Sequence, residues 1–177
     1  GMIFTKGILE IPKYGFLNIH ASLLPKWRGA SPIQSTILNG DEEIGITIML
    51  LNEKMDEGPI LAISKLKSPI SNLNYKELEE KLAEIGGKLL VETIPKWING
   101  EIKTQSQNHS QATYTQKIAK EDGLIDWNET PEIIERKIRA YNHWPGAYIF
   151  IGGKRLIITQ AEIKNTSLKI KRVKPEG

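Results

Sequence analysis

Residues 16–25, Phe-Leu-Asn-Ile-His-Ala-Ser-Leu-Leu-Pro, are the stretch from which the rest of the sequence can be organised. The first five predict a short β-strand, in which side chains alternate between two faces. Asn18 and His20 therefore share one face, and the apolar residues beside them share the other. Two polar side chains that point the same way, directly before a loop rich in Leu and Pro, indicate a candidate site.

The residues after this loop predict a helix and a buried strand. A helix is expected over 31–38, with Pro32 in its first turn and Asn39-Gly40 at its end. Residues 44–51 are β-branched and mostly apolar, which is typical of a strand covered on both faces.

The clearest helix signal starts at Asn74, a good N-cap with Glu77 three residues further on. Apolar residues follow at helical spacing, and the helix is expected to end near Trp97. Residues 101–118 lose this periodicity and collect Thr, Gln, Ser and Asn, which is typical of a polar linker. We therefore predict a domain boundary in this segment.

Beyond the linker, the sequence predicts one more helix and a small β-unit. Thr130-Pro131 starts a helix that runs to about Tyr141. Three short strands follow, with a hairpin turn at Gly152-Gly153 between the first two. They cover residues 148–151, 155–159 and 168–173.

The composition limits the class of protein. The 177 residues include 24 Lys and Arg against 21 Asp and Glu, and a net charge of +3 permits a nucleic-acid partner without requiring one. The absence of cysteine excludes a disulfide framework and a thiolate zinc site, and fits a cytoplasmic location. No apolar run approaches the roughly 18 residues of a membrane span, so we predict a soluble protein. His109 and His143 have no partner at ligand spacing, so no metal site is expected.

Asn18, His20 and Asp56 form a candidate polar trio that can support acyl transfer to an amine without a metal. The Asn18 amide can donate to an oxyanion, and the His20 imidazole can share that task or relay a proton. Asp56 can orient or charge the imidazole, or accept the proton itself. Taken alone, a strand histidine is more often a hydrogen-bonded core residue, and an aspartate before Gly-Pro more often caps its own backbone. A hydrolase triad with Ser22 is disfavoured, since Ser22 lacks the Gly-x-Ser-x-Gly elbow.

The pattern Asn-x-His-x-Ser-Leu-Leu-Pro over 18–25, with Gly29 after it and Asp56 before Gly58-Pro59, resembles the signature of the tetrahydrofolate-dependent formyltransferases. The resemblance covers nearly all of residues 6–177. It is closer to the methionyl-tRNA formyltransferases than to the sugar-nucleotide N-formyltransferases because of the segment Tyr114 to Asp126. Further segments match in order and spacing, namely 30–34, 45–49, 113–118, 125–127, 138–142 and 144–146.

The resemblance implies an α/β fold of two domains joined by a linker. Residues 2–100 are expected to be the second part of a catalytic domain with a partial doubly wound, Rossmann-like sheet. Residues 101–118 are the expected linker, and 119–177 a shortened C-terminal domain like an open β-barrel. The N-terminal half of the catalytic domain has no counterpart in this chain. A sheet without its flanking strands exposes an edge, so we expect self-association.

The resemblance also implies an activity. Its co-substrate is 10-formyltetrahydrofolate, and the acceptor is the amino group of initiator methionyl-tRNA, in translation initiation. Two alternatives stay open: a sugar-nucleotide N-formyltransferase, and an inactive fragment that binds folate or tRNA. The resemblance assigns catalysis to Asn18, His20 and Asp56, and contact with tetrahydrofolate to Ser22, Leu23, Leu24 and Pro25.

Overall fold

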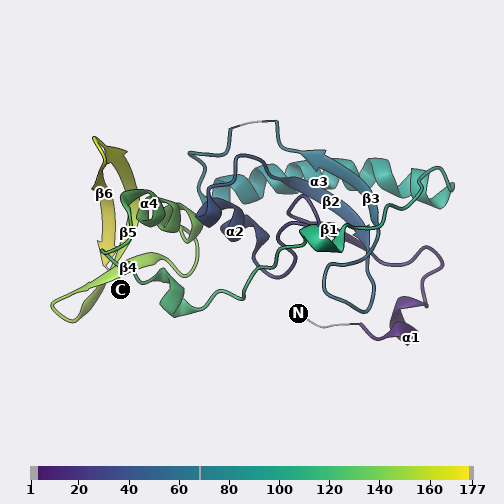
Figure 1. The fold of residues 1–177 in the computed structure, drawn as a ribbon, viewed down its shortest axis with the longest axis horizontal. Helices are drawn as coiled ribbons and strands as arrows, with labels where there is room; N and C mark the ends of the chain where they lie inside the picture. Colours follow the sequence, from purple (N-terminus) through teal and green to yellow (C-terminus); the bar gives the residue numbers. More distant parts are fainter. Residues whose placement is uncertain (1–3, 68, 176–177) are drawn as a thin grey trace. The chain divides into compact units, whose positions relative to one another are not determined.

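The computed structural model describes residues 4–67 and 69–175, and it contains helices and two small antiparallel sheets (Figure 1). The chain divides into two compact units, which are described separately. Unit 1 comprises Gly1–Pro32, Glu43–Pro69 and Glu79–Lys117, and unit 2 comprises Ile33–Glu42, Ile70–Leu78 and Ile118–Gly177. In chain order the elements are α1 (Lys6–Leu9), β1 (Leu17–His20), α2 (Pro32–Asn39), β2 (Gly45–Leu50), β3 (Ile60–Lys65), α3 (Tyr75–Ile98), the 3-10 turns η1 (His109–Gln111) and η2 (Lys120–Gly123), α4 (Pro131–Ala140), β4 (Ala147–Ile151), β5 (Lys154–Lys164) and β6 (Ser167–Pro175).

The sheet of unit 1 has the strand order β1-β2-β3, and both pairings are antiparallel. β2 lies in the middle and is buried along most of its length, as its β-branched sequence predicts. The α/β class is confirmed, but the pairing differs from the parallel strands of a doubly wound sheet. One reason is the connection over residues 51–59, which is shorter than the crossover of about a dozen residues that parallel strands need. The doubly wound sheet itself stays a prediction.

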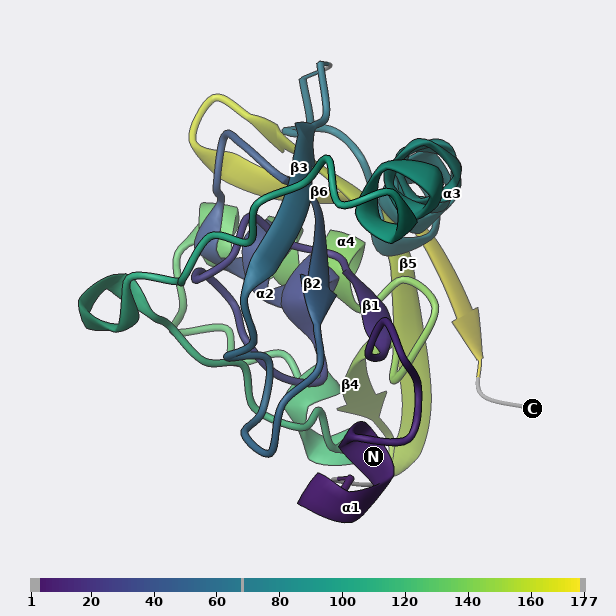
Figure 2. The ribbon, with the colours of Figure 1, turned by 90° about the vertical axis from the view of Figure 1, so that its right-hand side faces the viewer.

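Helix α3 runs along one face of this sheet, beside β1 and β2 (Figure 2). Gly86 permits the close packing, since a Cβ atom there would lie 3.0 Å from Ile19 Cγ2 and 3.6 Å from Ile46 Cγ1. The predicted capping box starts the helix. The Glu77 N–H donates to Asn74 Oδ1 at 3.1 Å, and the Asn74 N–H donates to the Glu77 carboxylate at 2.9 Å.

The other face of the sheet carries the loop that follows β1. Leu24 from this loop packs against Met49 of β2 in a small buried cluster. Directly opposed residues of two antiparallel strands share a face. Asn18 is opposite Met49 and His20 is opposite Thr47, so both predicted site residues lie on the side of the sheet that the loop covers.

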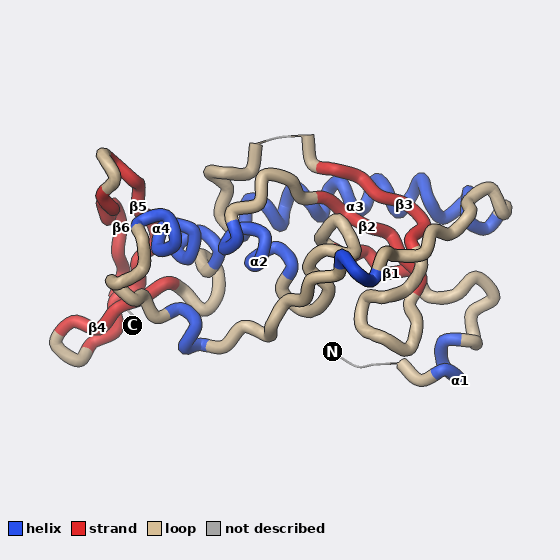
Figure 3. Tube along the Cα trace, in the orientation of Figure 1, coloured by secondary structure: helices blue, strands red, loops and turns tan. Residues whose placement is uncertain are grey.

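Unit 2 contains α2, α4 and the antiparallel meander β4-β5-β6, drawn by element type in Figure 3. Helix α4 begins where it was predicted to begin, after the N-cap Thr130, whose side chain accepts from the Ile133 N–H. The predicted hairpin is confirmed, with φ of 57° at Gly152 and 76° at Gly153. β5 and β6 are longer than the sequence indicated. A buried core cluster of this unit contains Ile125, Ile134, Ile138, Ala147 and Ile158.

Two predictions about organisation stay predictions. The outer domain limits, residues 2 and 177, lie outside the described residues, and contacts group residues 101–117 with unit 1. The second prediction is that residues 119–177 form a domain like an open β-barrel. The sheet described here has three strands, β4-β5-β6, so the barrel stays a prediction. Within residues 4–67 and 69–175, no helix is both long and apolar enough to cross a bilayer.

Candidate active site

His20 is the last residue of β1, and its side chain is only 6% exposed. Its Nε2 lies 2.9 Å from the backbone carbonyl oxygen of Trp27. A carbonyl oxygen can only accept, so Nε2 must carry the proton that it donates. In the neutral ring the lone pair is therefore on Nδ1, and this nitrogen lies 3.8 Å from Asp56 Oδ2. The geometry leaves Nδ1 able to accept a proton beside a carboxylate.

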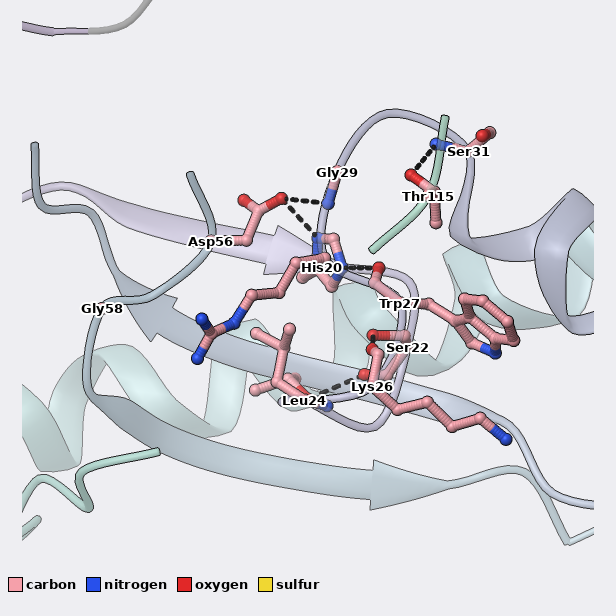
Figure 4. A network of polar contacts seen from close by, with 12 residues as sticks. His20, Ser22, Leu24, Lys26, Trp27, Gly29, Ser31, Asp56, Gly58 and Thr115 are labelled. Carbon is pink, nitrogen blue, oxygen red and sulfur yellow. Dashed lines mark hydrogen bonds and ion pairs between the residues drawn. The ribbon is translucent and has the colours of Figure 1, made fainter. Parts of the chain in front are cut away.

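Asp56 projects towards His20 from the loop between β2 and β3 (Figure 4). Its Oδ2 also accepts a 2.7 Å hydrogen bond from the Gly29 N–H, so one carboxylate oxygen contacts both the imidazole and the loop after β1. The side chain is 16% exposed, which leaves it accessible at the edge of the site. The backbone of Asp56 is in the left-handed region, with φ of 51°. This conformation is uncommon for a residue other than glycine.

The loop after β1 is held against β2 by hydrogen bonds to Thr47. The Thr47 hydroxyl donates to the Ser22 carbonyl at 2.7 Å and accepts from the Leu24 N–H at 3.1 Å. The Ser22 hydroxyl donates to the Lys26 carbonyl at 2.5 Å, which closes the loop on itself. Because these groups are buried, their pairing is required for the loop to pack at all.

Residues 113–115 lie beside the second half of this loop and fix its backbone. Arg28 N–H donates to the Thr113 carbonyl at 2.9 Å, and Thr115 N–H donates to the Arg28 carbonyl at 2.7 Å. The Thr113 hydroxyl accepts from the Trp27 N–H at 2.9 Å. Gly29 is needed at this contact, since φ is 109° and a Cβ atom would lie 2.6 Å from the Thr115 hydroxyl oxygen.

Arg28 is a fully buried cation under the Asp56 loop. Its Nε and Nη2 donate to Gln107 Oε1 at 3.1 and 2.7 Å, and Nη1 donates to the Tyr114 hydroxyl at 3.2 Å. Nη2 also donates to His109 Nδ1 at 3.0 Å, and Nη1 lies 3.3 Å from Glu57 Oε1. The guanidinium charge is thus paired with a carboxylate, and its N–H groups point at hydrogen-bond acceptors, as a buried guanidinium requires.

Some of the predicted site residues lie close together in the structure, whereas others bind or pack within the protein itself. His20 and Asp56 meet as expected, and Asn18 joins them by sharing their side of the sheet. Among the predicted folate contacts, the Ser22 hydroxyl is bound within the loop and Leu24 is buried in the core. Leu23 and Pro25 are half-buried. The assignment of all seven residues to catalysis or folate contact stays a prediction.

Sequence reasoning did not include Arg28 or Gln107 in the site, and it treated residues 101–118 as a linker of which residues 113–118 carry part of the family resemblance. Gln107 is 6% exposed despite its polar surroundings in the sequence. One available signal was the Thr113-x-Thr115 spacing, which places two hydroxyl groups on one side of an extended segment. Within the part of the chain that the structure describes, no group of His, Cys, Asp and Glu side chains is arranged to hold a metal ion.

Comparisons with known proteins identify the family. The protein-family model described as formyl transferase matches residues 1–94. The family model described as formyl transferase, C-terminal domain, matches residues 117–175. Methionyl-tRNA formyltransferase of Marinobacter nauticus is 47% identical over 162 residues, which are 91% of this chain and 51% of that protein. The chain thus spans about half the length of the curated relatives it matches.

Two solved structures share the fold. Methionyl-tRNA formyltransferase from Clostridium thermocellum has a TM-score of 0.75 at 24% identity, covering 99% of this chain and 74% of that one. The N-formyltransferase from Helicobacter canadensis, in complex with folinic acid and dTDP-3-aminofucose, has a TM-score of 0.72 at 25% identity, covering 84% of this chain and 55% of that one. The resemblance predicted from the sequence is confirmed, and this chain belongs to the formyl transferase family.

Proposed function

We propose that this chain supplies the catalytic trio of a cytoplasmic methionyl-tRNA formyltransferase. The reaction is transfer of the formyl group of 10-formyltetrahydrofolate to the amino group of initiator methionyl-tRNA. The observation that carries the proposal is the His20 ring, whose Nε2 is bound to the Trp27 carbonyl while Nδ1 faces Asp56 at 3.8 Å. The 47% identity with the Marinobacter nauticus protein supports the choice of acceptor.

Each residue of the trio has a defined part in this chemistry. As the amine nitrogen bonds to the formyl carbon, the carbonyl oxygen gains negative charge, and the Asn18 amide donates to it. His20 Nδ1 accepts the proton that the attacking nitrogen loses, and Asp56 stabilises the resulting imidazolium. When the bond from the formyl carbon to N10 breaks, the imidazolium returns the proton to N10. The products are the formylated amine and tetrahydrofolate.

We propose that residues 22–25 contact the folate co-substrate, and the structure distinguishes which of their side chains are accessible for this contact. Ser22 and Leu24 are buried, and their side chains already have partners within unit 1. The half-buried Leu23 and Pro25 and the loop backbone are the better candidates for contact with the co-substrate. Substituting Leu23 should therefore raise the KM for folate more than it lowers kcat.

We also propose that β1 is an association edge. Among the described strands, β1 pairs with β2 along one side only, and Ile19 in it is 43% exposed. Val91 and Ile98 on α3 are 72% and 45% exposed. An unpaired strand edge favours pairing with a further strand, and exposed apolar side chains favour association. Multi-angle light scattering should show species larger than 19.9 kDa, and a stable monomer in dilute solution would contradict this point.

The decisive experiment is a formyl-transfer assay of this chain, alone and fused to the N-terminal half of the Marinobacter nauticus relative. The fusion is expected to formylate methionyl-tRNA, and the same fusion with Asp56→Asn is the matched control. A folded fusion that binds folate without transferring formyl would support the inactive-fragment alternative instead.

A second acceptor class is tested in the same assay. The fold shared with the Helicobacter canadensis N-formyltransferase gives the sugar-nucleotide alternative a specific basis. Offering dTDP-3-aminofucose in place of methionyl-tRNA separates the two activities. Formylation of the amino sugar without formylation of methionyl-tRNA would overturn our choice of acceptor.

A further inference from the structure

Gln107 binds the backbone of the loop that carries Asp56. Its Nε2 donates to the Asp56 carbonyl at 2.9 Å and to the Gly58 carbonyl at 2.8 Å. Both amide protons are therefore used, and they hold the two residues that flank Glu57. Gln107 comes from a segment 49 to 51 positions away in sequence, so this contact adds a long-range restraint to the loop.

Arg28 sets the orientation of the Gln107 amide. The guanidinium donates twice to Gln107 Oε1 and has no acceptor of its own, so the amide oxygen must face Arg28. The NH2 group must then face the Asp56 loop. A flipped amide would place NH2 against the cation and its oxygen against two carbonyl oxygens. The buried charge of Arg28 thus permits a single orientation of the Gln107 side chain.

The conformation of the loop shows why such a clamp is needed. Asp56 has φ of 51°, a region that non-glycine residues seldom occupy. Gly58 lies so close to the Leu50 carbonyl that any Cβ atom there would overlap it. Because the Gln107 bonds are made to the carbonyls of these two residues, they hold the backbone in the shape that aims the Asp56 carboxylate at His20.

We propose that Gln107 is a positioning residue of the formyl-transfer site: fixed by buried Arg28, it holds the Asp56–Gly58 backbone so that the Asp56 carboxylate faces both His20 and Gly29. The inference rests on the proposed function for its kinetic consequence but not for its structural one. Gln107 acts through Asp56 and makes no contact with the reacting atoms.

Gln107→Glu isolates the donor role of the side chain. The carboxylate keeps the contacts with Arg28, but it replaces the two N–H donors by an oxygen that faces two carbonyl oxygens. The readout in this chain is the Gly29 amide proton, which donates to Asp56 Oδ2 at 2.7 Å. Its protection from hydrogen exchange should fall at least about tenfold. The matched control is Gln111→Glu, an exposed glutamine in the same segment, which should leave Gly29 unchanged.

A measurement on the unaltered chain covers the case in which Gln107→Glu does not fold. The side-chain amide protons of Gln107 should exchange at least about tenfold more slowly than those of the exposed Gln111. Equal exchange rates for the two side chains would overturn the proposal. So would unchanged Gly29 protection in a folded Gln107→Glu variant.

Kinetics distinguish positioning from a general structural role. In the active fusion, Gln107→Glu should lower kcat about 10- to 100-fold, because the carboxylate is displaced from its partner. The KM for folate should change less than about threefold. In an Asp56→Ala background, the same substitution should have no further effect on kcat. An equal loss in both backgrounds would show that Gln107 does not act through Asp56. If no variant of the fusion transfers formyl, the proposed function fails, while the exchange data still decide the role of Gln107.

Discussion

The candidate active site in unit 1 and the β4–β6 sheet in unit 2 are both made of short segments, but they are held in different ways. The sheet is held by a continuous backbone ladder and a core of aliphatic side chains. The site loops are held by buried polar side chains such as Thr47, Gln107 and Arg28, which bind backbone groups or each other. Removing one member of such a network leaves its buried partners without hydrogen bonds. We therefore expect single substitutions to act more strongly in the site than in the sheet.

The largest effect is expected for His20→Gln. The new amide can still donate to the Trp27 carbonyl, but no group remains at the Nδ1 position to accept the proton. Formyl transfer by the fusion should fall about 10²- to 10⁴-fold in kcat, which is the usual contribution of general acid–base catalysis. His143→Gln, an exposed histidine of unit 2, should leave kcat unchanged. Near-normal turnover in His20→Gln would remove His20 from the mechanism.

The next effect is on stability, for Arg28→Met. The substitution keeps an unbranched apolar stem but removes the guanidinium, so Gln107 Oε1 loses both of its Arg28 donors and Glu57 keeps only the exposed Lys54 as a cationic partner. We expect the free energy of unfolding to fall by about 3–5 kcal/mol, as for other broken buried ion pairs. Urea titration followed by amide resonances of unit 1 measures this change. Lys103→Met, at an exposed lysine, should stay within about 0.5 kcal/mol, and a similar small value for Arg28→Met would contradict the network.

A core substitution in unit 2 provides the comparison with the sheet. Ile158 is 1% exposed and belongs to the aliphatic core beneath β5. Ile158→Val should lower the free energy of unfolding by about 0.5–1.5 kcal/mol, through loss of one buried methylene. Ile163→Val in the same strand, where the side chain is 40% exposed, should cost less. A larger loss at Ile158 than at Arg28 would reverse the ranking of the two regions.

The smallest expected effects have opposite signs for the same substitution. Gly153 has φ of 76° and open space around it, so Gly153→Ala should destabilise the β4–β5 hairpin by about 1 kcal/mol for backbone reasons alone. Gly87 is exposed within α3, also with open space around it. Gly87→Ala should stabilise that helix by about 0.5–1 kcal/mol, because alanine loses less backbone entropy than glycine. Thermal unfolding of both variants tests the pair, and changes of the same sign would be the contrary result.

The regular elements could be predicted from the sequence because each has a local signal. The Asn74 and Glu77 pair marks the start of α3, and Gly152-Gly153 marks the first hairpin. The antiparallel order of β1-β2-β3 could not be predicted from periodicity, since alternation fixes the faces of a strand but not the direction of its neighbour.

The candidate site was predictable only in part, because sequence periodicity does not show which distant segments contact each other. Asn18 and His20 share a face by strand geometry, and Asp56 was placed with them for its chemistry and by the family resemblance. Gln107 could not be found in this way, because a buried polar contact between distant loops has no sequence period. The composition of residues 101–118 suggested solvent exposure, whereas the fold buries Gln107, whose side chain binds the Asp56 loop.

The partner of the His20 ring is a carbonyl oxygen of the peptide chain, and one partner of the Asp56 carboxylate is a peptide N–H. Every amino acid except proline contributes both groups, so substitution at position 27 does not delete the acceptor that sets the tautomer. Alanine scanning would therefore underestimate this part of the site. The two positions differ in their tolerance, because the carbonyl of residue 27 is kept in any residue type, whereas residue 29 must stay glycine for its φ of 109° and its contact with Thr115.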